Sequence, residues 1–237
     1  KNLGFKEVTQ NSIDAVSDRD FIAEMMFNIS LASIHLSRIS EEFIIWSSSQ
    51  FNYLELPEEL CTGSSIMPQK RNPDMAELVR GGAAKTIGNL VSLLSLLKNQ
   101  PLAYNRDNQE DKAPLFASID YVSSAIDITS AMVAGAKFNI DEMLNDVFDG
   151  HICATDFAEY LVLKGLPFRE AHAITGKAVQ LAEKKDALLA ELSLTELKKL
   201  SKKIEKDVYK YLDPMTSVSA KTLSLIHISE PTRQKPI

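Results

Sequence analysis

The sequence predicts an all-α protein: a bundle of long helices followed by a small C-terminal helical domain. Three stretches carry apolar residues at alternating steps of three and four, the spacing that places them on one face of a helix. Only nine glycines and nine prolines occur in 237 residues, which disfavours a turn-rich β architecture. No stretch of convincing length alternates apolar and polar residues as a half-buried strand does.

The first long helix is predicted over residues 19–46. Its apolar stripe runs from Ile22 to Trp46, and we expect Trp46 to be buried in the bundle. A second apolar side is formed by Phe21, Met26, Phe27, Leu31 and Ile34. Because a helix that is apolar on two sides packs among several neighbours, we expect both sides to be covered. Ser17 and Asp20 have the spacing of a capping box that would start this helix.

Two more long helices follow a polar connection over residues 47–73. The second helix is predicted to start after Asn72, with Pro73 in its first turn, and to end near Leu97. The third is predicted over 114–134. Three glycines fall within the second helix, namely Gly81, Gly82 and Gly88. Each costs roughly 1 kcal/mol of helix propensity, so we expect them to permit close approach of a neighbouring helix.

The remaining helices are shorter. They are predicted over 141–148, 155–164, 168–185 and 194–211, and Ser193 and Glu196 form a capping box at the start of the last. We therefore place a boundary between a helical-bundle domain over 1–148 and a C-terminal helical domain over 149–222. Residues 223–237 depart from the helical pattern and include a stretch that looks like translated adapter sequence, so we interpret them as a non-native tail.

Composition excludes several classes of function. The net charge of −6 argues against a nucleic-acid-binding surface, and no apolar run approaches the roughly 20 residues that a membrane-spanning helix needs. Two cysteines, Cys61 and Cys153, are too few for a disulfide scaffold and indicate a reducing compartment, the cytoplasm. Zinc, phosphate-loop and nucleophile-elbow motifs do not occur, and we expect neither a metal nor a cofactor.

The segment over 63–74 carries the most chemical information. It places two hydroxyl groups, Ser64 and Ser65, together with Lys70 and Asn72, in a loop directly before a predicted helix. The free amides and the dipole at a helix N-terminus favour an anion such as a carboxylate. Loops held by rigid helices are also common positions for catalytic groups.

This segment, GSSIMPQKRNPD, resembles the signature of the fumarase/aspartase superfamily, whose members are tetrameric helical enzymes. Within that superfamily, Gln69 and the segment over 104–112, YNRDNQEDK, are similar to the argininosuccinate lyases. Further similar segments lie at 11–21, 154–156 and 164–172. The resemblance covers about residues 3–222 and implies a long-helix bundle of the fumarase/aspartase type.

The resemblance also implies a reaction: β-elimination that cleaves argininosuccinate into arginine and fumarate, in arginine biosynthesis or the urea cycle. It implies that Ser64 abstracts the proton and that Lys70 stabilises the serine alkoxide, the developing aci-carboxylate, or both. Asn72 would bind the succinyl carboxylate. The residues implied to bind the rest of the substrate are Tyr104, Gln109 and Lys112, and Lys112 suits the arginine-side carboxylate as a point charge.

Two further implications concern other chains and other residues. The family assembles each active site from several subunits of a homotetramer, so we expect that assembly here. Its second catalytic group, a histidine, would lie before the residues given, and we expect the chain to begin within a larger protein. None of the four histidines is assigned that role, and we interpret His35 as a core or interface residue.

Three alternatives remain at this point. The first is another fumarate-releasing lyase, such as adenylosuccinate lyase, which Gln69 and the segment 104–112 argue against. The second is a non-catalytic, crystallin-like structural protein, which the retained Ser64, Lys70 and Asn72 disfavour. The third is a helical interaction module in which the loop motif is a coincidence.

Overall fold

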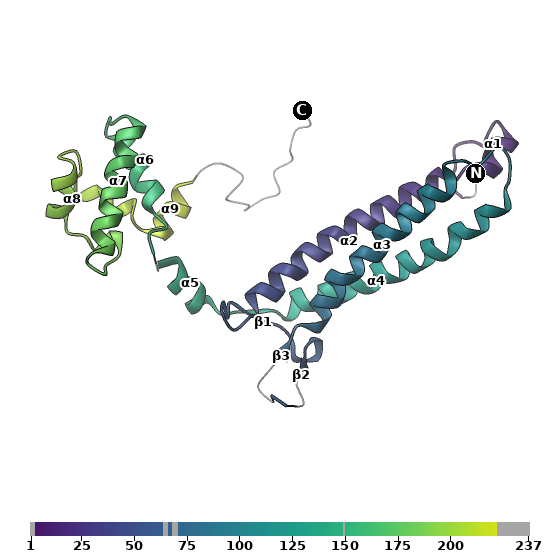
Figure 1. Ribbon diagram of the computed structural model, residues 1–237, viewed down its shortest axis with the longest axis horizontal. Coiled ribbons are helices and arrows are strands. Elements are labelled where there is room, and N and C mark those ends of the chain that lie inside the picture. The colour runs from purple at the N-terminus through teal and green to yellow at the C-terminus, as the bar shows by residue number, and fades with distance from the viewer. Residues whose placement is uncertain (1–2, 64–65, 68–70, 149, 222–237) are drawn as a thin grey trace. The chain divides into compact units, whose positions relative to one another are not determined.

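A computed structural model, shown in Figure 1, describes residues 3–63, 66–67, 71–148 and 150–221. The prediction of an all-α fold is confirmed, because the strands of this part of the chain contain two residues each. The chain forms two compact units, residues 1–139 and 140–237. The predicted domain boundary between residues 148 and 149 remains a prediction, and the predicted tail over 223–237 lies outside the described residues.

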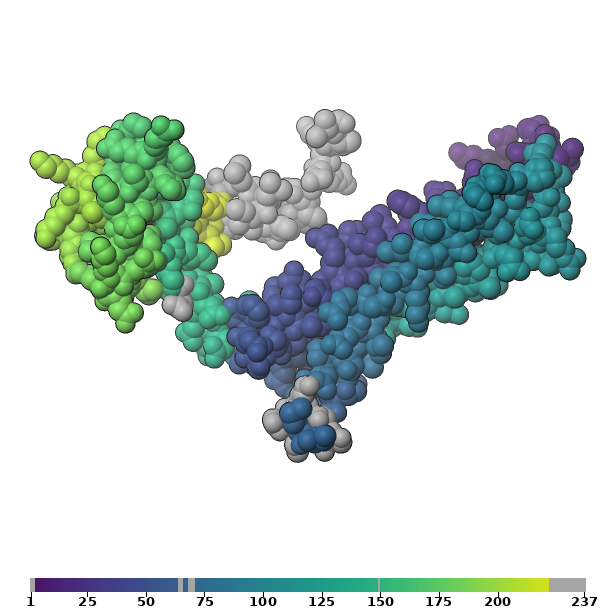
Figure 2. All heavy atoms as spheres, in the orientation of Figure 1, coloured from purple at the N-terminus to yellow at the C-terminus, as the bar shows by residue number. Residues whose placement is uncertain are grey.

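The first unit is built on three long helices that lie alongside one another (Figures 1 and 2). These are α2 (Asp20–Trp46), α3 (Asp74–Leu97) and α4 (Lys112–Gly135), and the short helix α1 (Ser12–Ser17) precedes them. The predicted bundle helices are therefore confirmed within a few residues at each end. In the described part of the chain, no helix is long and apolar enough to cross a membrane.

Two short antiparallel strand pairs lie at one end of the bundle, which we call the hairpin end. Strand β1 (Leu54–Glu55) pairs with β4 (Lys137–Phe138), with Leu54 opposite Phe138. Strand β2 (Thr62–Gly63) pairs with β3 (Arg71–Asn72), with Thr62 opposite Asn72. The 3-10 helix η1 (Glu58–Leu60) lies between β1 and β2. The core beneath these elements contains Phe43, Leu54, Leu56, Ala76 and Met132.

The opposite end of the bundle, which we call the η2 end, brings together the start of α2, the end of α3 and the 3-10 helix η2 (Arg106–Asp111). Its core contains Ile22, Met26 and Leu93. Between the two ends, the buried Ser30 hydroxyl donates to the Thr86 carbonyl at 3.1 Å and so links α2 to α3. The bundle therefore has two well-anchored ends separated by the full length of α3.

Helix α2 begins differently from the capping-box prediction, which is wrong. Ser17 belongs to α1, where its hydroxyl donates to the Asp14 carbonyl. The Asp18 carboxylate instead accepts from the Asp20 amide at 3.0 Å, and only two residues, Asp18 and Arg19, separate α1 from α2. Helix α1 has its own cap, Asn11, whose side chain accepts from the next amides.

The second apolar side of α2 is only partly covered. Met26 is fully buried, but Phe21, Phe27, Leu31 and Ile34 are exposed among the residues that the structure describes. Trp46, predicted to be buried, is only half-buried. Among the residues described, part of the apolar surface of α2 is therefore not buried by the rest of this chain.

The prediction that glycines permit close helix approach holds at one position. A Cβ atom at Gly82 would overlap the ring of Tyr121 on α4, and the Tyr121 hydroxyl donates to the Val79 carbonyl at 2.6 Å. At Gly81 and Gly88 no described atom lies within 4 Å of an added Cβ. Of these three glycines, only Gly82 is therefore required for α3 and α4 to pack.

The second unit is a cluster of shorter helices. They are α5 (Ile140–Phe148), α6 (Ala154–Leu163), α7 (Phe168–Glu183), η3 (Leu189–Glu191), α8 (Leu194–Leu200), η4 (Lys206–Lys210) and α9 (Pro214–Ala220). Their core includes Phe157, Tyr160, Leu161, Leu197, Ile204 and Val208. The sequence prediction had no helix at α9, although Asp213 and Pro214 form a capped start, with the Asp213 carboxylate accepting from the Thr216 amide.

The single helix predicted over residues 194–211 is wrong, because α8 ends at Leu200 and a turn leads to η4. The turn has a physical reason. It presents the Glu205 amide to the buried Tyr160 hydroxyl, which accepts it at 2.9 Å and itself donates to Asp207 at 2.7 Å. A continuous helix would have to leave this buried hydroxyl to find other partners.

The capping box at Ser193 is confirmed. The Glu196 carboxylate accepts from the Ser193 amide at 2.9 Å, and the Ser193 hydroxyl accepts from the Glu196 amide. Glu196 is also paired with Lys185. The hydrogen bonds from Lys185 and then Ser193 lower the pKa of Glu196 from its ordinary 4.5 to about 2.

This lowered pKa predicts a pH-dependent contribution of Glu196 to stability. The ionised carboxylate stabilises the fold fully above the unfolded pKa, and the contribution is lost as the pH falls toward the folded pKa. We expect Glu196→Gln to lower the melting temperature at about pH 6 and the difference to narrow from about pH 4.5 downward. The control is Glu183→Gln, at an exposed position. A difference that stays constant down to about pH 3 would contradict the prediction.

The packing of α3 on α4 predicts opposite effects at two adjacent glycines. We expect Gly82→Ala to lower the free energy of unfolding, because overpacking costs about 1–3 kcal/mol and replacing a helical glycine returns only about 1 kcal/mol. The matched variant Gly81→Ala should raise it by up to about 1 kcal/mol. Urea unfolding measures both, and a Gly82→Ala protein as stable as Gly81→Ala would show that Tyr121 moves aside freely.

Candidate active site

The signature loop is held at its base by the ladder between β2 and β3. Gly63 pairs with Arg71 and Thr62 with Asn72, so the two ends of the loop are fixed directly before α3. The predicted catalytic residues Ser64 and Lys70 lie outside the described residues. Asn72 is half-buried in β3, two residues before the first residue of α3.

Side chains on both sides of this ladder reinforce it. The Thr62 hydroxyl donates to the carboxylate of Asp74, the first residue of α3. The Arg71 guanidinium pairs with Glu55 of β1 at 2.8 Å. The N-cap residue of α3, Pro73, makes no capping hydrogen bond through its side chain. An anion beside Asn72 would be favoured by the N-terminal amides and the dipole of α3.

A hollow of about 770 Å³ lies beside this ladder, and its lining includes Ser47, Ser48, Asn72 and Cys61. Burial raises the pKa of the Cys61 thiol, and the opposing effect of Arg71 is smaller. The thiol therefore stays protonated near neutral pH and is a poor base or nucleophile.

At the other end of the bundle, η2 sorts its side chains by a three-residue period. Residues three apart lie on the same side of a 3-10 helix. Asn108 and Asp111 accordingly point inward and are fully buried, whereas Gln109 and Lys112 are exposed. Tyr104 is exposed just before η2. The structure thus gathers three of the predicted substrate-binding residues at the η2 end.

The turn before η2 is built by a side chain that the sequence analysis gave no role. The Asn105 amide group donates to the carbonyls of Pro101 at 2.9 Å and Ala103 at 3.2 Å. These bonds stabilise the positive φ of 80° at Ala103, a backbone conformation that alanine rarely adopts. Asn105 therefore fixes the backbone on which Tyr104 is presented.

An ion pair that the sequence did not reveal joins two of the segments that resemble the family, 11–21 and 104–112. Arg19, at the start of α2, donates through Nε to the Asp111 carboxylate at 2.7 Å. Lys112 donates to the other carboxylate oxygen at 2.8 Å. Arg19 and Asp111 are 92 residues apart in the chain. Their position in the segments 11–21 and 104–112 was the available signal, but nothing in the sequence paired them.

The predicted site residues do not all come together within this chain. Asn72 directly precedes α3, and Tyr104, Gln109 and Lys112 follow its far end. The 24 residues of α3 span about 36 Å at a rise of about 1.5 Å each. A small-molecule substrate that contacts Asn72 is too short to reach Lys112 of the same chain as well.

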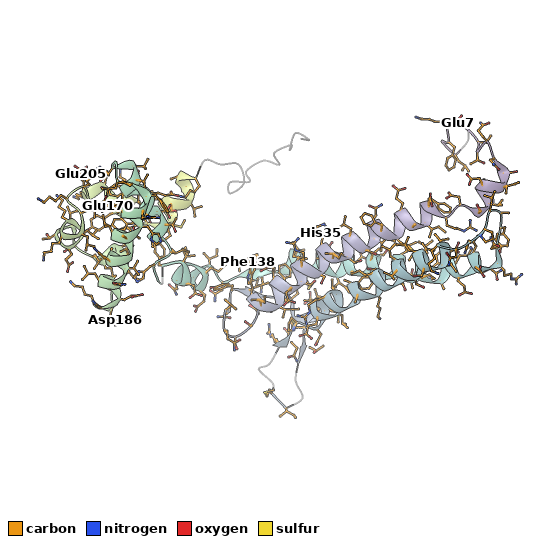
Figure 3. All side chains as sticks on the ribbon, turned by 45° about the horizontal axis from the view of Figure 1, so that its top comes forward. Glu7, His35, Phe138, Glu170, Asp186 and Glu205 are labelled. Carbon is orange, nitrogen blue, oxygen red and sulfur yellow. The ribbon has the colours of Figure 1, made fainter. Side chains whose placement is uncertain are left out.

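Histidines and metal ligands add no further site in this part of the chain. His35 is exposed on α2 (Figure 3), so it is not a core residue of the isolated chain. His172 is exposed on α7, and His151 is half-buried before α6. Among the residues described, no group of three His, Cys, Asp or Glu side chains is arranged to hold a metal ion.

Comparisons with known proteins assign the chain to a family. Residues 1–88 match the Lyase family, and residues 151–219 match the family described as argininosuccinate lyase C-terminal. The argininosuccinate lyase of Ruthia magnifica subsp. Calyptogena magnifica is 50% identical over 219 residues, which are 92% of this chain and 46% of that protein. That of Halorhodospira halophila is 51% identical over 222 residues, 94% of this chain and 48% of that protein.

The chain belongs to the argininosuccinate lyase family. It spans about half the length of the curated relatives it matches. Each matched region lies within one unit of the structure. The region over 1–88 lies in the first unit and includes α2 and the signature loop, and the region over 151–219 lies in the second unit with α6 to α9.

Solved structures of other lyases share the fold of this chain. EDDS lyase in complex with formate has a TM-score of 0.79 and 29% identity, covering 91% of this chain and 45% of that chain. Class II fumarase from Schistosoma mansoni has a TM-score of 0.70 at 20% identity, covering 90% of this chain and 45% of that chain, and it supports the fold alone.

Proposed function

We propose that the protein containing this chain cleaves argininosuccinate into arginine and fumarate by β-elimination, as part of arginine biosynthesis or the urea cycle. The observation that carries the proposal is the identity of about half of the aligned residues with curated argininosuccinate lyases. A structural relative, a variant of EDDS lyase that is 28% identical to this chain, holds bound fumarate. Fumarate is also a product of the reaction that we propose.

The hairpin end supplies the elimination chemistry in this proposal. Ser64, as an alkoxide, takes the proton from the succinyl carbon beside a carboxylate, and the electron pair spreads into that carboxylate to form an aci-carboxylate. The pair then forms the double bond of fumarate as the carbon–nitrogen bond breaks. The guanidino nitrogen leaves with the electrons of that bond as a neutral guanidine, which takes up a proton to give the guanidinium of arginine. Lys70 stabilises the developing negative charge, and Asn72 with the start of α3 binds the succinyl carboxylate.

The η2 end supplies the binding of the arginine moiety. Arg19 and Lys112 carry one positive charge each, and Asp111 carries one negative charge, so these three side chains have a net charge of +1. The exposed Lys112 ammonium therefore favours an anion. The α-carboxylate of the arginine moiety is the corresponding group of the substrate. Gln109, three residues before Lys112 and also exposed, and Tyr104 supply neutral hydrogen-bonding groups.

A homotetramer with active sites shared between subunits reconciles the two ends. One chain holds them about 36 Å apart along α3. A second chain must therefore supply its exposed Tyr104, Gln109 and Lys112, which we call the η2 face, to the first chain's hairpin end. Large apolar residues exposed along the bundle support assembly: Phe21 is 64% exposed on α2, Leu78 63% on α3 and Phe116 58% on α4. Burying such surface between copies is favourable.

Two alternatives, another fumarate-releasing lyase and a crystallin-like structural protein, are less well supported. The curated relatives carry the name argininosuccinate lyase over nearly the whole chain, which favours that substrate over adenylosuccinate. A crystallin-like structural role has no observation in its favour beyond the shared fold. We place the enzyme in the cytoplasm, since the two cysteines of this chain, Cys61 and Cys153, are unpaired.

The proposal predicts distinct kinetic effects at two positions of the hairpin end. The assay uses this chain fused behind the N-terminal half of the Ruthia magnifica relative, hereafter the fusion protein, and follows fumarate by its ultraviolet absorbance. We expect Ser64→Ala to lower kcat by at least about 100-fold with little change in KM, because it removes the base. Asn72→Ala should raise KM, because it removes a contact to the succinyl carboxylate.

Ser65→Ala is the matched control, since it removes an adjacent hydroxyl. If Ser65→Ala abolishes turnover and Ser64→Ala does not, the base is one residue further along. If both variants turn over normally, the serine-base mechanism is wrong. A fusion protein that releases fumarate from adenylosuccinate but not from argininosuccinate would contradict the proposal that argininosuccinate is the substrate.

A further inference from the structure

The carboxylate of Asp111 is the most completely buried charge near the η2 face. Its side chain is 0% exposed and each oxygen contacts a different cation. Arg19 Nε donates to Oδ2 at 2.7 Å, and Lys112 Nζ donates to Oδ1 at 2.8 Å. A buried carboxylate is strongly unfavourable unless it is paired and hydrogen-bonded. Both cations are therefore constrained by Asp111.

The two cations differ in exposure. The Arg19 side chain is 13% exposed, whereas that of Lys112 is 59% exposed. Lys112 also donates to the Asn108 carbonyl at 3.4 Å. An ammonium group has three N–H donors, so one remains for a ligand on the exposed side. Arg19 is the inner partner of Asp111, and Lys112 is the outer one.

Arg19 is itself fixed on its other side. Its Nη1 donates to the Asp18 carbonyl at 2.6 Å and to the Val16 carbonyl at 3.3 Å. The planar guanidinium thus spans the junction of α1 and α2 and the carboxylate at the end of η2, with a geometry that a lysine cannot reproduce. In this way the start of α2 sets the position of η2.

We propose that Arg19 is a positioning residue for the anion-binding face of η2. By neutralising the inner side of Asp111, it fixes the Lys112 ammonium at the exposed edge, at a set spacing from Gln109, where it binds the carboxylate of an amino-acid moiety. Without Arg19, the buried carboxylate has Lys112 as its only cation and draws it inward. This inference rests on the proposed function, whose substrate supplies the carboxylate.

The test compares Arg19→Gln with Glu41→Gln in the fusion protein. Glu41 pairs with Arg80 at 2.7 Å and links α2 to α3, and both partners are substantially exposed. We expect Arg19→Gln to raise KM for argininosuccinate about tenfold while kcat falls by less than about threefold, the pattern of a lost binding contact away from the reacting bond. Glu41→Gln should change both constants by less than about twofold.

A double variant separates positioning from stability. Arg19→Gln with Asp111→Asn removes the buried charge together with its partner, so we expect the melting temperature to recover toward that of the unaltered protein. KM should remain raised, because Lys112 has lost the carboxylate that holds it. If KM recovers along with the melting temperature, Arg19 is only a structural residue and the inference is wrong.

Hydrogen exchange on the 237-residue chain tests the same inference without turnover. We expect Arg19→Gln, and not Glu41→Gln, to accelerate exchange of the amides of η2, including the Asn108 amide that donates to the Asn105 carbonyl. Unchanged exchange would overturn the inference. A fusion protein that releases no fumarate contradicts the proposed function, whereas normal release with an unchanged KM in Arg19→Gln contradicts the inference alone.

Discussion

Helix α3 separates the two groups of predicted site residues, and its length is the constraint on which the proposed site depends. Its 24 residues span about 36 Å. The helix is fixed on both flanks, by the Ser30 hydroxyl on the Thr86 carbonyl from α2 and by the Tyr121 hydroxyl on the Val79 carbonyl from α4. Bending α3 to bring its ends together would break these contacts.

The same three helices provide a physical reason to assemble. Their interiors are closed by small groups, such as Gly82 against Tyr121, while large apolar side chains remain exposed along their outer faces. Association between copies would cover these faces, and the proposed tetramer is one such association. One set of helices would then serve both stability and the construction of the site.

Local patterns predicted the helices well because periodicity and capping depend on neighbouring residues. The helices α2, α3 and α4 and the capping box at Ser193 are confirmed. The capping box predicted at Ser17 failed locally, because Ser17 belongs to α1 and the Asp18 carboxylate accepts from the Asp20 amide instead. Another failure depends on a distant partner. The helix predicted over 194–211 is broken where the Glu205 amide meets Tyr160, 45 residues away.

The candidate site divides in the same way. The motifs located Asn72, Tyr104, Gln109 and Lys112 as a set, but their separation by α3 became visible only in three dimensions. The pairing of Arg19 with Asp111 joins residues 92 positions apart, and no local pattern records it. The exposed sides of the bundle also escaped prediction, since an apolar stripe does not reveal whether its partner lies in the same chain.

Subunit mixing tests most directly whether the site is shared between chains. Fusion proteins carrying Ser64→Ala and Lys112→Met are unfolded together in equal amounts, refolded and assayed far below KM. If Ser64 and Lys112 come from different subunits, random assortment leaves both residues intact in about a quarter of the sites, and the mixture exceeds the mean of the two separate variants. Activity equal to that mean, with mixed oligomers demonstrated, would contradict a shared site.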